Sequence, residues 1–160
     1  MVNNLRTVYE LVTHSPEETQ RLGARLGELA VPGDIYLLTG ALGTGKTCLT
    51  QGIARGLNIK ELAVSPSFVL VRELHGRLPL YHIDLYRLDN IEEIIDLGLD
   101  EYFYGSGVCV IEWAEKGLSA MPEEHLLIQI DYLADTERRL QLIPGGKHYL
   151  EIVGKLKKRA

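Results

Sequence analysis

The eight residues Gly40–Thr47, with the sequence GALGTGKT, constrain the fold of this 160-residue chain more than any other segment. They match the pattern G-x-x-x-x-G-K-[S/T] without a gap. The apolar run before them, residues 35–39, is too short for a helix and predicts a buried strand. Residues 46–57 follow with apolar side chains at helical spacing. The segment therefore predicts a strand, a glycine-rich turn and a helix in direct succession.

A turn of this kind is a phosphate-binding P-loop. Backbone N–H groups converge on phosphate oxygens, glycines permit the required backbone angles, and the start of the helix adds partial positive charge. We expect Lys46 to contact the β- and γ-phosphates of ATP and the Thr47 hydroxyl to bind Mg²⁺. The nucleotide-binding residues predicted in this segment are Gly40, Leu42, Gly43, Thr44, Gly45, Lys46, Thr47 and Cys48.

Two acidic residues follow apolar runs and are candidates for the chemistry of hydrolysis. Asp84 comes after residues 80–83, and Glu112 ends the run 108–111. The carboxyl ends of parallel strands line the nucleotide crevice in folds of this type. Asp84 sits in an alternating pattern, so a solvated strand residue or a partner of Arg87 is the alternative. Glu112 is harder to explain without a metal or cation, because an unpaired buried carboxylate is costly.

Several other residues have weaker signals. Ser65 and Ser67 flank a proline after the P-loop helix and could form a loop that senses the γ-phosphate, although such residues usually only make turns. We interpret His75 and His82 as surface or hairpin residues rather than ligands. Trp113, the single tryptophan, is interpreted as a core residue or part of a partner surface.

The remaining patterns predict a single α/β domain over residues 1–160, with a P-loop NTPase-like central sheet of mixed parallel and antiparallel strands flanked by helices. Residues 68–74 and 80–86 form a predicted antiparallel hairpin, and Asn90 caps a predicted helix over 91–103 that buries Ile91, Ile94, Ile95 and Leu97. The other predicted strands span residues 5–12, 108–112, 125–132 and 138–143, and the other predicted helices begin at Ser15-Pro16 and at residue 147.

Composition narrows the functional class. The formal net charge is −5, and the cations Lys155, Lys157, Lys158 and Arg159 are gathered near the end, so the rest is more acidic still. Such a chain is a poor candidate for wrapping nucleic acid. Two cysteines exclude a disulfide scaffold. No apolar run approaches membrane-spanning length and no signal peptide precedes the first strand, so we expect a cytoplasmic protein without membrane partners.

Four motifs in the same order resemble the TsaE (YjeE) family of bacterial P-loop ATPases. They are Gly40–Thr47, the segment SPSF at residues 65–68, HIDLYRL at residues 82–88 and IEW at residues 111–113. The chain departs from the family at Ser67, which usually is threonine, and at Ala41, which commonly is acidic. The Ser67 hydroxyl survives and the side chain of position 41 need not touch phosphate, so the resemblance stands.

The resemblance implies a function and a partner set. Family members act with TsaB and TsaD, which attach a threonylcarbamoyl group to N6 of adenosine 37 in tRNAs that read ANN codons, and their ATP hydrolysis permits repeated turnover. It further implies that Thr47 and Glu112 hold Mg²⁺, that Asp84 serves hydrolysis by positioning water, and that tRNA is bound mainly by the partners. Nucleotide contacts are implied for Ser65, Ser67, Arg138 and the segment near Ser15–Thr19.

Two other classes compete with this interpretation. One is a small-molecule kinase of the P-loop type, which would need an acceptor pocket and an arginine-bearing lid that the sequence does not suggest. The other is a non-catalytic module that grips a partner in its ATP state. The chain offers no obvious arginine finger of its own, so we expect slow hydrolysis that depends on a partner.

Overall fold

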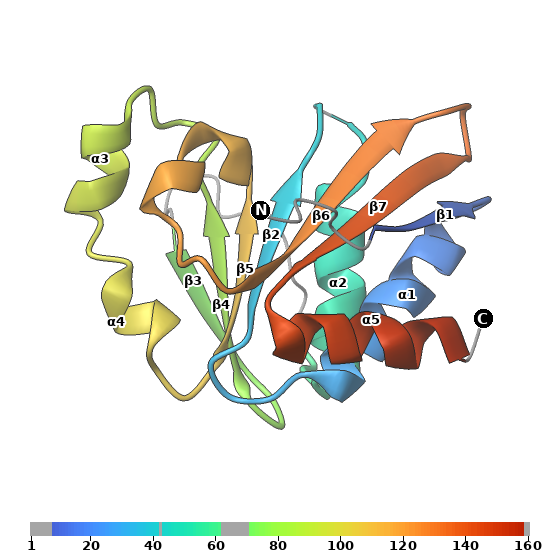
Figure 1. Cartoon of the computed structure of the whole chain (residues 1–160), viewed down its shortest axis with the longest axis horizontal. Helices are drawn as coiled ribbons and strands as arrows, with labels where there is room; N and C mark the ends of the chain where they lie inside the picture. The colour runs from blue at the N-terminus through green and yellow to red at the C-terminus, as the bar shows by residue number, and fades with distance from the viewer. Residues whose placement is uncertain (1–7, 42, 62–70, 159–160) are drawn as a thin grey trace, which may run out of the picture.

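The computed structural model describes residues 8–41, 43–61 and 71–158, which form one seven-stranded sheet with helices on both faces (Figure 1). The spatial order of the strands is β1-β7-β6-β2-β5-β4-β3. Their bounds are β1 Tyr9–Thr13, β2 Ile35–Thr39, β3 Val71–His75, β4 Pro79–Asp84, β5 Val108–Glu112, β6 His125–Tyr132 and β7 Arg138–Gly145.

The sheet is mixed, as predicted. Its four central strands, β6, β2, β5 and β4, run parallel to one another. Strand β7 pairs antiparallel with β6 and with β1, and β3 pairs antiparallel with β4 across a short hairpin. The parallel strands therefore all end at the same edge of the sheet, which is where the P-loop begins.

Among the residues that the structure describes, five helices cover the sheet: α1 Pro16–Leu29, α2 Lys46–Gly56, α3 Ile91–Asp96, α4 Asp100–Phe103 and α5 Lys147–Lys158. Short 3₁₀ turns span Ala114–Lys116 and Leu118–Ala120. Within the part of the chain that the structure describes, no helix is both long and apolar enough to cross a membrane.

Alternation along β2 divides the interior into two cores. Tyr36 and Leu38 face helices α1, α2 and α5, whereas Ile35 and Leu37 face helices α3 and α4. All four side chains are at most 3% exposed. A strand buried on both faces is what the continuous apolar run at residues 35–39 predicts.

Helices α1 and α2 pack with their backbones in contact. A Cβ atom at Gly52 would lie well inside 3.0 Å of the Gln20 carbonyl oxygen, and one at Gly56 would meet the Ala24 carbonyl in the same way. Glycine is therefore required at these positions by the neighbouring backbone rather than by the helix itself. The close approach fixes the start of α2 relative to the start of α1.

The predicted helix over 91–103 is wrong in one respect. The structure has two short helices, α3 and α4, separated by Gly98, whose φ of +67° is a left-handed conformation that interrupts a helix. Ile95 on α3 is 61% exposed instead of buried, whereas Ile94 remains in the core. Asn90 caps α3 as predicted, accepting a hydrogen bond from the Glu93 N–H at 3.0 Å.

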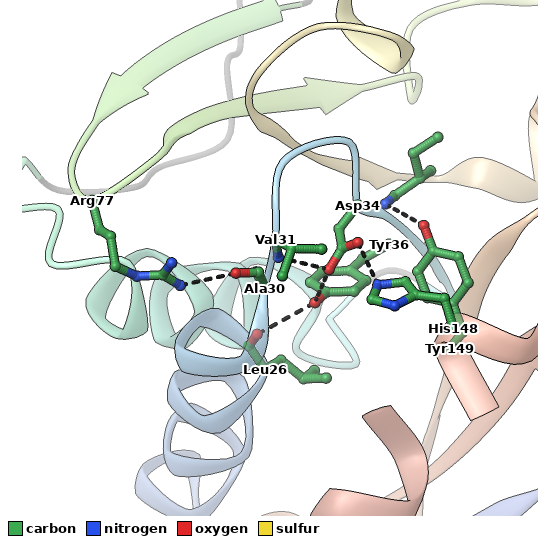
Figure 2. A network of polar contacts seen from close by, with 9 residues as sticks. Leu26, Ala30, Val31, Asp34, Tyr36, Arg77, His148 and Tyr149 are labelled. Carbon is green, nitrogen blue, oxygen red and sulfur yellow. Dashed lines mark hydrogen bonds and ion pairs between the residues drawn. The ribbon is translucent and has the colours of Figure 1, made fainter. Parts of the chain in front are cut away.

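A polar network around the buried Asp34 ties the start of α5 to the amino end of β2 (Figure 2). Asp34, 2% exposed, accepts hydrogen bonds from the Val31 N–H at 3.1 Å and the Tyr36 hydroxyl at 3.3 Å, and pairs with His148 at 2.7 Å. The Tyr149 hydroxyl accepts the Ile35 N–H at 2.9 Å, and burial raises its pKa to about 12. This network anchors the last helix to the first buried strand.

Candidate functional site

The carboxyl edge of the parallel strands gathers the acids that the sequence singles out. In the register of the sheet, Asp84 of β4 lies opposite Glu112 of β5, and Glu112 lies opposite Leu38 of β2. The P-loop leaves β2 one residue further on, after Thr39. The acids at 84 and 112 therefore stand next to each other and beside the loop.

Lys46 is the first residue of α2 and points back over the P-loop. Its Nζ donates to the carbonyl oxygens of Gly40 at 2.7 Å and Ala41 at 2.8 Å, and it lies 4.0 Å from the centre of the Trp113 ring. The side chain is only 5% exposed. Burial lowers the pKa of the Lys46 ammonium, and the nearby carboxylates, with Glu115 the strongest, oppose that shift.

Glu112 is a buried carboxylate, 2% exposed, whose two oxygens have different partners. Oε1 accepts a hydrogen bond from the Thr47 hydroxyl at 3.0 Å. Oε2 lies 2.5 Å from His82 Nε2 and 3.1 Å from the Thr50 hydroxyl. Thr47 and Glu112, which the family resemblance implies as the metal ligands, are thus in direct contact.

The sequence interpretation placed His82 on the surface or in a hairpin, and only the hairpin is right. His82 belongs to the β3–β4 hairpin but is fully buried, with 0% exposure, whereas His75 at the hairpin tip is exposed as expected. Strand alternation puts His82 on the same face as Leu80 and Asp84. Alternation alone does not tell whether that face meets solvent or a helix, so the sequence carried no signal for the burial of His82.

Asp84 is half-buried, and its Oδ1 accepts the Tyr86 N–H at 2.9 Å. This bond orders the turn that follows β4. The carboxylate remains at the edge of the sheet beside Glu112, where it also raises the pKa of Lys46.

Trp113 lies in the site, which sequence reasoning missed. Its φ of +60° is a left-handed conformation that is costly for an aromatic residue. The turn directs its ring onto Lys46, and the ring of Tyr86 packs against it with 4.9 Å between ring centres. Next along the chain, Glu115 Oε2 accepts the Gly40 N–H at 3.2 Å. The segment that follows β5 therefore contacts both ends of the P-loop, Gly40 through Glu115 and Lys46 through Trp113.

A cavity of about 210 Å³ adjoins the P-loop on its other side. Segments distant in sequence meet there: Cys48 Sγ is 3.4 Å from the Pro16 carbonyl, and Arg138 Nε donates to the Thr44 carbonyl at 2.9 Å. The lining residues are Ser15, Pro16, Thr19, Thr44, Gly45, Cys48, Asp135, Thr136 and Arg138. The structure thus brings Arg138 and the Ser15–Thr19 segment to the P-loop. Leu42, Ser65 and Ser67, also predicted to contact nucleotide, lie outside the described residues.

The oxygen donors at this edge fit Mg²⁺. The described residues contain no group of three or more His, Cys, Asp or Glu side chains able to enclose a metal ion. Mg²⁺ does not need one, because it takes one or two protein oxygens together with phosphate and water. The Thr47 hydroxyl and Glu112 Oε1, 3.0 Å apart, supply such a pair.

Comparison with known sequences identifies relatives of this chain. The family described as "Threonylcarbamoyl adenosine biosynthesis protein TsaE" matches residues 13–140. The tRNA threonylcarbamoyladenosine biosynthesis protein TsaE of Treponema pallidum is 46% identical over 129 residues, which cover 81% of this chain and 96% of the relative. The protein of the same name from Bacillus subtilis is 44% identical over 138 residues, covering 86% of each.

A solved structure extends the similarity to the whole fold. The crystal structure of Bacillus subtilis YdiB superposes with a TM-score of 0.86 at 36% identity, covering 98% of this chain and 99% of that one. Similarity of this extent includes β1 and α5, which lie mostly outside the matched range 13–140.

Proposed function

The chain belongs to the TsaE family of threonylcarbamoyl adenosine biosynthesis proteins, and on that premise we propose that it hydrolyses ATP to drive the modification of tRNA. Its place in the biosynthesis of tRNA threonylcarbamoyladenosine follows from the family. The finer proposal is that it acts in the cytoplasm with homologues of TsaB and TsaD and permits them multiple turnovers.

One observation carries the ATPase proposal: the Glu112 carboxylate touches Thr47 at the start of α2, with Asp84 opposite it on the adjacent strand. A P-loop alone needs only backbone amides and a lysine to hold phosphates. Hydrolysis needs in addition a metal ligand and a group that orients water. Thr47 and Glu112 would hold Mg²⁺, which when bound neutralises charge on the phosphates.

The other residues have roles that follow from their positions. Lys46 would exchange its bonds to the Gly40 and Ala41 carbonyls for bonds to the β- and γ-phosphates. Asp84 would orient the attacking water, and the cavity beside Cys48 and Arg138 would receive the adenosine end of the nucleotide. An arginine supplied by a partner would add the charge stabilisation that makes hydrolysis fast.

The test of hydrolysis is phosphate release from ATP without any added acceptor. We expect slow Mg²⁺-dependent release by the wild type and a loss of about 100-fold in Glu112→Gln, because removal of the metal ligand costs several kcal/mol of transition-state stabilisation. Glu151→Gln, on the exposed face of α5, is the matched control and should retain wild-type release. Release that requires a small-molecule acceptor would identify a kinase instead.

The test of the pathway role is reconstitution of tRNA modification with TsaB and TsaD. We expect product to exceed one equivalent per TsaD molecule only when this chain and ATP are present. Glu112→Gln should bind nucleotide yet fail to support repeated turnover. Unchanged product with Glu112→Gln would contradict a role for hydrolysis and leave a nucleotide-dependent binding module.

A further inference from the structure

We propose that His82 is the positioning residue for Glu112, fixing the carboxylate so that Oε1 faces Thr47 and the metal. The inference rests on the proposed function, since it assigns Glu112 to Mg²⁺, and it adds a residue that neither the P-loop nor the acids include. It would make metal affinity depend on a side chain that touches neither metal nor nucleotide.

The two carboxylate oxygens of Glu112 contact different residues. Oε1 points to Thr47, at 3.0 Å, and is the oxygen available at the phosphate side. Oε2 is held from the interior by His82 Nε2 at 2.5 Å. A carboxylate fixed through one oxygen cannot rotate without breaking that bond, so its second oxygen keeps its direction.

His82 provides the dedicated donor for this bond. The Thr50 hydroxyl also lies within reach of Oε2, at 3.1 Å, but it is 2.9 Å from the Lys46 carbonyl as well. A hydroxyl has one proton to donate, so Thr50 divides it between two acceptors. The imidazole N–H has no competing acceptor at Nε2 among the described hydrogen bonds.

The surroundings of the ring determine which nitrogen carries the proton. His82 is fully buried, and its Nδ1 has no hydrogen-bond partner among the described residues. A buried N–H without an acceptor is costlier than an unused lone pair, so the proton belongs on Nε2, where it meets Glu112. The ring is therefore oriented as a donor to the carboxylate.

The sheet holds the ring in place. His82 is the register partner of Val110 on β5, two residues before Glu112, and strand alternation puts all three on the face that packs against α2. The backbones of His82 and Glu112 are therefore fixed by two neighbouring strands inside the sheet, β4 and β5. Supporting residues of this kind typically contribute 10- to 100-fold to metal affinity.

The experiment is calorimetric titration with ADP, once with excess MgCl₂ and once with EDTA, on the wild type, Glu112→Gln, His82→Leu and His82→Gln. In His82→Leu we expect the Mg²⁺-dependent gain in ADP affinity to fall about tenfold, as in Glu112→Gln. The affinity of His82→Leu for ADP in EDTA should stay within about twofold of the wild-type value. The amide nitrogen of His82→Gln reaches the Nε2 position and should restore most of the gain. His75→Leu, an exposed histidine on the neighbouring strand, is the matched control.

Each alternative result has a defined meaning. The inference would be overturned if His82→Leu kept the wild-type Mg²⁺-dependent gain in ADP affinity, or if it lost the same ADP affinity in MgCl₂ and in EDTA. Either result would leave the assignment of Thr47 and Glu112 to the metal intact. No Mg²⁺ gain in the wild type would overturn the ligand assignment of the proposed function, and the inference with it. If thermal unfolding shows that His82→Leu does not fold, His82→Asn replaces it. The amide nitrogen of asparagine lies at the position of Nδ1 and not of Nε2, so it cannot donate to Glu112. If both His82→Asn and His82→Gln kept the Mg²⁺-dependent gain in ADP affinity, the proposal would be overturned.

Discussion

Replacing Gly52 with alanine should separate α1 and α2, the two helices that border the cavity beside the P-loop. The added Cβ would lie well inside 3.0 Å of the Gln20 carbonyl oxygen and at 2.9 Å from its carbonyl carbon. These are backbone atoms, so no side-chain rotation relieves the overlap. Helices α1 and α2 must move apart along the face where they now touch.

The magnitude follows from two opposing effects. Overpacking of a tight contact costs about 1–3 kcal/mol or more, and a clash with backbone belongs at the upper end. Alanine in place of glycine inside a helix returns about 1 kcal/mol. The net loss is therefore about 2 kcal/mol, which for a chain of this size lowers Tm by roughly 4–8 °C.

Thermal and urea unfolding followed by circular dichroism measure this loss. Gly154→Ala is the matched control, because a Cβ at Gly154 in α5 meets nothing within 4 Å. The same substitution should there raise stability by about 0.5–1 kcal/mol. ADP affinity should also fall severalfold in Gly52→Ala, because α2 carries the P-loop lysine.

The reasoning would be refuted if Gly52→Ala were as stable as wild type, or if it gained stability in parallel with Gly154→Ala. Either result would mean that the helix contact yields without cost. A loss of stability with unchanged ADP affinity would keep the packing argument and reject its link to the cavity.

Three further predictions concern single side chains. Asp34→Ala should lower the free energy of unfolding by about 3 kcal/mol in urea titrations, because it removes the acceptor of three hydrogen bonds at about 1 kcal/mol each, and a loss below about 1 kcal/mol would contradict the network. Burial raises the pKa of the Cys109 thiol from 9.0 to about 12, so its contribution to stability is complete below pH 9 and declines as the unfolded chain ionises first. Wild type should lose about 1 kcal/mol more than Cys109→Val between pH 9 and pH 10, and parallel curves would contradict this. Lys46→Met should weaken ADP binding about tenfold in calorimetry with and without Mg²⁺, whereas a loss confined to MgCl₂ would place Lys46 with the metal.

The fold was predictable where a local pattern has one structural solution. The run at residues 35–39 followed by Gly40–Thr47 allows only a buried strand, a loop and a helix, and the structure has all three. The prediction of one helix over 91–103 was wrong because Gly98 takes a left-handed conformation, which the spacing of apolar residues does not reveal. The two helices that replace it bury fewer of the predicted side chains.

The meeting of the two acids was predictable, because Asp84 and Glu112 each follow an apolar run and parallel strands end at the same edge of a sheet. The register of β4 and β5 places them opposite each other. His82 was misjudged because a histidine in an alternating strand has the same pattern whether its face meets solvent or a helix. Arg138 was implied only by the family resemblance, because its contact with Thr44 joins segments 94 residues apart.

The turn that directs Trp113 onto Lys46 gives the molecule an optical signal of its own. The chain has a single tryptophan, and an ammonium 4.0 Å from the ring centre perturbs the excited state of the indole. If Lys46 leaves the ring for a phosphate, as we propose, the emission spectrum should change, with no other indole to obscure it. Intrinsic fluorescence of unlabelled protein would then report occupancy of the P-loop.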